Sequence, residues 1–123
     1  GEQQEQANPA VQVPAGPQKA VYEVLSPAFV VNFQSQGRQR YMQASVALMS
    51  RNESELDQLK VHMPTLRNQL VMLFSSQDFE SLNTPIGLEL LKQKVTAAVQ
   101  ELAMREVGSP VVEQVLFTNF VMQ

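Results

Sequence analysis

Residues 29–48 decide the fold, and they read FVVNFQSQGRQRYMQASVAL. Phe29, Val31 and Phe33 alternate with smaller or more polar residues, which is the period-two pattern of a strand with one buried face. Gly37 can adopt the positive φ that a tight turn requires. The stretch therefore predicts an antiparallel hairpin. Its second strand is expected to bury Met42, Ala44, Val46 and Leu48 and to expose Tyr41, Gln43, Ser45 and Ala47.

Three helical segments are predicted after the hairpin. Asn52 can cap the first, with Glu55 three residues later as the second member of a capping box. Pro64 has no N–H to donate, so the helix should kink or restart there. Thr84 marks a further start, and Gly108 marks the end of that helix. The apolar residues at helical spacing, which are expected to be buried, are Leu56, Leu59, Met63, Leu66, Leu70, Leu73, Phe74, Leu88, Leu91, Val95, Val99 and Leu102.

The last element, residues 111–122, is apolar on both faces when it is read as one uninterrupted strand. A strand of this kind is usually central in its sheet and covered on both sides. Three helices cover one face of a sheet easily and two faces poorly. We therefore expect either that the sheet curls over itself or that one of its faces meets a partner.

Length and composition indicate one α+β domain preceded by a linker. The chain has 123 residues, which is sufficient for a single core. Residues 1–18 are rich in Gln and Pro and are expected to form a flexible linker, so the folded domain is predicted over residues 19–123. No apolar run approaches the roughly 20 residues that cross a bilayer.

Charge and the scarcity of reactive side chains exclude several functions. A net charge of −3 gives no field that would attract nucleic acid. There is no Cys, and His62 is the single His, so neither metal binding nor nucleophilic catalysis has convergent partners. Asp78 and Glu80 fall in the segment 75–83, which is expected to be a solvated connector. We therefore predict no catalytic, cofactor-binding or metal-binding residues, and a protein that works by binding other proteins.

Three segments carry a resemblance to a known family. They are residues 22–33 with the Gly37 turn after them, residues 82–91 (LNTPIGLELL) and residues 115–123 (VLFTNFVMQ). In this order they resemble the opening hairpin, the helix start and the closing strand of the periplasmic domain of FliL, the flagellar basal-body-associated family. One departure is residues 86–88, which are apolar where family members tend to be more charged.

The resemblance implies a stomatin-like (SPFH-like) domain, with a curved antiparallel sheet and about three helices packed against it. It also implies a bacterial inner-membrane protein, with one transmembrane helix on the N-terminal side of this chain and the present domain in the periplasm. The implied partners are the stator units of the flagellar motor and further copies of the same protein in a ring. The implied role is to support torque and motility.

We expect the protein contacts on the outer face of the hairpin and on the first helix, where polar side chains gather. The residues predicted for them are Arg38, Arg40, Tyr41, Glu55, Gln58 and His62. The alternative is a periplasmic ligand-binding or sensory module, because an α+β domain with a core rich in Met and Phe can hold a pocket. A closed apolar cavity with a few convergent polar groups would favour that alternative.

Overall fold

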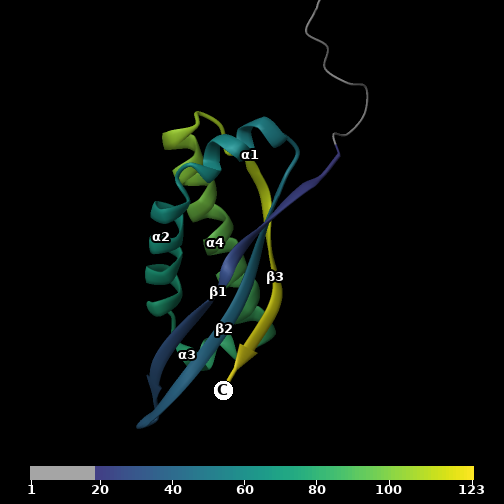
Figure 1. Cartoon of the computed structure of the whole chain (residues 1–123). Helices are drawn as coiled ribbons and strands as arrows, with labels where there is room; N and C mark the ends of the chain where they lie inside the picture. The colour runs from purple at the N-terminus through teal and green to yellow at the C-terminus, as the bar shows by residue number, and fades with distance from the viewer. Residues whose placement is uncertain (1–18) are drawn as a thin grey trace, which may run out of the picture.

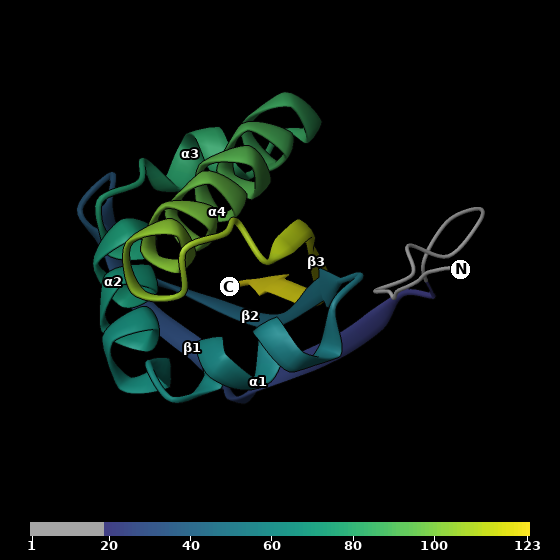
Figure 2. The same ribbon diagram turned by 90° about the horizontal axis from the view of Figure 1, so that it is seen from above.

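The computed structural model describes residues 19–123, so the predicted linker 1–18 lies outside the described residues. The strands form one antiparallel sheet in the order β1–β2–β3. The sheet is long and twisted, and the helices lie on one side of it (Figures 1 and 2). The predicted α+β class is confirmed. The elements are β1 (Val21–Ser35), β2 (Arg38–Ser50), α1 (Glu53–Lys60), α2 (Met63–Ser75), α3 (Phe79–Leu82), α4 (Pro85–Glu106) and β3 (Val112–Met122).

The β1–β2 hairpin forms as predicted. Between its strands, Gln36 and Gly37 have φ values of 54° and 75°, which suit the two-residue turn of a twisted hairpin. Every member of the predicted buried set from Met42 to Leu48 is buried. Ala47 is buried as well, although the alternation predicts that it is exposed. Its cross-strand neighbours are Val24 and Leu116, and these larger side chains flank it on the same face.

The long helices begin where the sequence indicates. The Asn52 side chain accepts a hydrogen bond from the Glu55 N–H at 3.0 Å, which caps α1. The chain restarts as α2 with Pro64 in its first turn. Thr84 Oγ1 accepts from the Gly87 N–H at 3.0 Å and caps α4. These starts could be predicted because a cap is made by residues close together in the chain.

The second half of the predicted capping box is replaced by one long-range and one local hydrogen bond. The Glu55 carboxylate accepts a hydrogen bond from Ser109 Oγ at 2.7 Å. The Asn52 N–H, which the box assigns to Glu55, donates to Ser50 Oγ at 3.1 Å. The start of α1 is therefore joined to the end of β2 and to the segment that follows α4.

The expected connector 75–83 contains a short helix, α3, so the described residues hold one helix more than the three predicted. The Asp78 side chain accepts from the Ser81 N–H at 3.2 Å and caps it. Phe79 and Leu82 are buried, and the Phe33 and Phe79 ring centroids are 5.5 Å apart. Two apolar residues in so short a segment do not form a recognisable helical repeat, and this is why the sequence did not predict α3.

β3 is an edge strand, so the prediction that it is central was wrong; β2 is the central strand. The pairing of β2 with β3 shifts register between Ser45 and Val46 and again between Met49 and Ser50. These irregularities interrupt the alternation, and they place most of the large apolar residues of β3 on the helix side. The β3 residues paired with the buried face of β2 are Val112, Val115, Phe117, Phe120 and Met122.

The core lies between the sheet and the helices. Phe74 of α2 is its aromatic centre, with ring centroids 5.3 Å from Phe29 and 6.2 Å from Phe117. α4 closes the core with a fully buried stripe that contains Leu91, Val95 and Val99. The helices therefore use one face of the sheet, and no described helix covers the other face (Figures 1 and 2).

Candidate interaction surfaces

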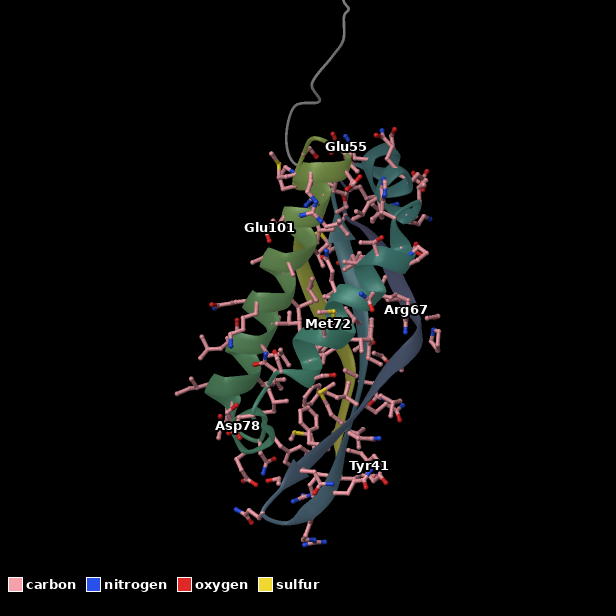
Figure 3. The ribbon with its side chains drawn as sticks, turned by 90° about the vertical axis from the view of Figure 1, so that its left-hand side faces the viewer. Tyr41, Glu55, Arg67, Met72, Asp78 and Glu101 are labelled. Carbon is pink, nitrogen blue, oxygen red and sulfur yellow. The ribbon has the colours of Figure 1, made fainter. Side chains whose placement is uncertain are left out.

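The residues predicted to contact other proteins fall into two groups at opposite ends of the domain. Arg38, Arg40 and Tyr41 belong to the β2 start, at the hairpin end. Glu55 and the rest of the α1 group lie at the other end, as the positions of Tyr41 and Glu55 in Figure 3 show. The six residues therefore do not form one continuous patch.

At the hairpin end, Arg40 has an internal role. Its guanidinium lies over the Phe79 ring, 4.6 Å from the centroid, and its Nε donates to the Gln123 carbonyl at 3.2 Å. Arg40 thus ties β2 to α3 and to the last residue of the chain. Arg38 and Tyr41 are exposed and are free to meet a partner. Nearby, Ser35 Oγ donates to the Glu80 carboxylate at 2.8 Å.

At the α1 end, Gln58 is exposed, while Glu55 and His62 are half-buried. The Glu55 carboxylate accepts the hydrogen bond from Ser109 Oγ described above. His62 is the residue before α2, and its Nδ1 lies 3.8 Å from a Glu106 carboxylate oxygen. These contacts connect α1 with the end of α4, so this end of the domain is built from residues far apart in sequence.

Two ion pairs near the surface join strand carboxylates to basic residues outside the sheet. Lys60 Nζ of α1 lies 3.3 Å from a Glu23 carboxylate oxygen of β1. Hydrogen bonding to Glu23, and then to Asp57, raises the pKa of Lys60. Arg51 Nε lies 2.9 Å from a Glu113 oxygen, and this hydrogen bond raises the pKa of Arg51. Both pairs are solvent-exposed, so they orient side chains more than they stabilise the fold.

Residues 19–123 hold neither a cluster of metal ligands nor a membrane-spanning helix. In this range no three His, Asp or Glu side chains come together in a way that could hold a metal ion. None of the helices described is both long and apolar enough to cross a membrane.

Two hollows in the surface lie beside predicted residues. One, of about 370 Å³, lies beside Glu55 and includes Arg51 and Gln100. The other, of about 280 Å³, lies on the sheet face away from the helices and is lined by Val30, Tyr41, Met42, Gln43, Val121 and Gln123. Sequence reasoning found Tyr41 but not Val30 or Val121. The apolar side chains at outward-facing positions of β1 were the signal that could have found this face.

The fold and these surfaces define a small α+β domain whose distinctive features are two polar ends and an open sheet face. Residues 22–123 match the family model of the flagellar basal body-associated protein FliL. The chain is also 30% identical over 109 residues to the flagellar protein FliL of Aquifex aeolicus (strain VF5). The aligned region covers 89% of this chain but 65% of that relative, so the chain spans less than two thirds of its length. The chain belongs to the FliL family, which confirms the resemblance found in the sequence.

Proposed function

We propose that this chain is the periplasmic domain of a single-pass inner-membrane protein that serves the flagellar motor as a non-enzymatic accessory. The main support is that the family match runs from β1 to the end of β3 and so covers the whole folded domain. The layering of helices on one face of an antiparallel sheet supports a stomatin-like (SPFH-like) fold within this proposal.

In this proposal the domain associates with stator units and with further copies of itself in a ring, and so supports torque and motility. A membrane tether raises the local concentration of neighbouring copies, so weak contacts between domains are sufficient. Contacts between two different surface patches are the kind that close rings.

The two polar ends of the domain support a head-to-tail contact. The hairpin end carries Arg38 and Arg40 near Glu80 of α3, and α1 carries Glu53, Glu55 and Asp57 together with Lys60. In a head-to-tail contact the exposed Arg38 of one copy would meet the exposed Glu53 of the next, and this pair of opposite charges would favour a single orientation. Tyr41 and His62 add aromatic area at the two ends, and Gln58 adds an amide that can donate and accept hydrogen bonds.

Charge reversal tests this contact in motile cells. Arg40 and Glu55 have internal partners, so reversal there is expected to reduce swimming partly through the fold. Arg38→Glu and Glu53→Lys change exposed residues and are cleaner. Each single variant should reduce swimming, and the double variant should recover it because the two charges exchange places. Parental swimming in both single variants, at parental protein levels, would place the ring contact elsewhere.

Light scattering over a range of concentrations, with and without a periplasmic stator fragment, tests the partner directly. We expect the scattering mass to rise when the fragment is added, and an unchanged mass would contradict stator association. The ligand-binding alternative has less support, because the 280 Å³ hollow lies on an open sheet face where Val30 and Tyr41 are exposed. It is not the closed cavity that such a module requires.

A further inference from the structure

The outer sheet face is the side of the β1–β2–β3 sheet that points away from the helices. Its exposed apolar side chains belong to all three strands. They are Tyr22 (58% exposed), Val24 (56%), Val30 (63%), Tyr41 (44%) and Val121 (39%). The register places them in cross-strand rows, with Val24 beside Ala47 and Leu116, and Val30 beside Gln43 and Val121. Single exposed apolar residues are ordinary, but a set that spans a whole sheet is not.

The strand residues of this face carry no charge, and at its border Arg51, which follows β2, lies close enough to Tyr22 for an electrostatic interaction. Of the four charged residues in the strands, Glu23 pairs with Lys60 of α1 and Glu113 pairs with Arg51 at the sheet end. Arg40 lies over Phe79 of α3. Arg38 is two residues from Arg40, so its side chain leaves the strand on that same helix side. The polar members of the outer sheet face are amides and hydroxyls, such as Gln43 and Ser45.

The centre of a protein–protein interface is typically rich in aromatic and apolar side chains and poor in charged ones, as this face is. A phospholipid surface is recognised through Lys and Arg, which this face lacks. Its shape fits another sheet, because two sheets pack face to face at about 10 Å with their strands nearly aligned. The hollow of about 280 Å³ beside Tyr41 gives room for a large side chain from the opposite sheet.

We propose that the outer sheet face binds the same face of a second copy. The first reason is charge. The chain has a net charge of −3, so two copies repel on average. An approach through two uncharged faces brings no like charges into contact. Because both copies would use the same patch, the contact is isologous and pairs copies two by two.

The second reason is area. Three strands at a spacing of about 4.8 Å, and about ten residues long at about 3.3 Å per residue, cover roughly 500 Å². Two such faces bury about 1,000 Å², which is in the range of weak, transient interfaces and exceeds most crystal contacts. We therefore expect a weak dimer that a shared membrane tether would strengthen. This proposal does not rest on the flagellar assignment, and it concerns a surface other than the head-to-tail contact.

Analytical ultracentrifugation of the chain up to about 1 mM, the effective concentration that a short tether supplies, tests the pairing. Two double variants place charges on the face: Val24→Lys with Val30→Lys, and Val24→Glu with Val30→Glu. The parent should dimerise, and each variant alone should dimerise about 100-fold more weakly. An equimolar mixture of the two variants should regain dimers because opposite charges then meet. The control is Leu90→Lys with Met104→Lys, which changes exposed apolar residues of α4 and should dimerise like the parent.

Circular dichroism and the unfolding midpoint establish that each variant is folded before its mass is compared. The pairing is overturned if the parent stays monomeric at the highest concentration, which would leave the face to a different polypeptide. It is also overturned if the charged variants dimerise like the parent, if their mixture stays monomeric, or if the α4 control weakens as much as they do. Binding of a monomeric parent to phosphatidylcholine vesicles would assign the face to lipid instead.

Discussion

Leu90 and Leu91 are neighbours in α4, but their surroundings differ completely. Leu91 is fully buried in the stripe that faces the sheet, whereas Leu90, about 100° around the helix from it, is 51% exposed. The helical period predicts the buried position of Leu91 from sequence alone. It does not say whether an apolar residue on the outer side, such as Leu90, has any role.

Truncation of these two residues should therefore have different effects. Leu91→Ala removes buried methyl groups and leaves a cavity, so we expect it to lower the free energy of unfolding by about 2–5 kcal/mol. Leu90→Ala should change it by less than about 0.5 kcal/mol. Urea unfolding of both variants measures the difference. Equal stability of the two would show that the facing of α4 is wrong.

Gly87 gives a second prediction at the residue scale. A Cβ added there would lie 1.8 Å from the Ser81 carbonyl oxygen, so α3 and the first turn of α4 must separate to admit it. We expect Gly87→Ala to lower the free energy of unfolding by about 1–3 kcal/mol through this overpacking. Ile86→Ala is the matched control, because Ile86 is 76% exposed and should tolerate the change. A Gly87→Ala variant as stable as the parent in thermal unfolding would argue against this close approach.

At the scale of elements, local signals were predictable and long-range ones were not. The hairpin and the helix starts at Asn52 and Thr84 depend on residues a few positions apart, so the sequence indicates them. The edge position of β3 depends on which strand it pairs with, and the side chains that it buries depend on two register shifts relative to β2; neither can be found in a local sequence pattern. The same shifts explain why β3 looked apolar on both faces. The split of the candidate site into two ends was missed for a similar reason, because it depends on where α1 sits along the sheet.

Ser50 joins three elements at one end of the sheet, and it is fully buried. Its Oγ donates to the Val111 carbonyl at 2.6 Å and accepts from the Asn52 N–H at 3.1 Å. Val111 has a φ of 59°, which is rare for a β-branched residue, so the hydrogen bond to its carbonyl helps to hold a strained turn before β3.

Ser50→Ala should leave these two backbone groups without their partner. We expect the free energy of unfolding to fall by about 1–3 kcal/mol. Ser54→Ala, at an exposed position in α1, is the control and should be close to neutral. Denaturant unfolding of the two variants decides the matter, and a neutral Ser50→Ala would mean that another group, such as water, replaces the hydroxyl.

At the scale of the whole molecule, the surfaces of the domain differ in the kinds of side chain that they carry. The helix side of the sheet holds the core, the two ends carry charged side chains, and the strand residues of the outer sheet face are apolar or uncharged polar residues. A tethered domain with two kinds of self-contact surface suits an assembly at a membrane, where weak contacts between neighbours add up. The family to which the chain belongs provides the biological setting in which we propose that this assembly works.

The most direct test of a role at the motor is the torque of single flagella in cells of the source bacterium that lack residues 22–123. Tethered-cell rotation at high load measures this torque, and electron microscopy establishes that flagella are still assembled. We expect flagella in parental number but reduced torque and swimming, with both restored when the complete protein is supplied. Parental torque in cells shown to lack the domain would contradict the proposed function.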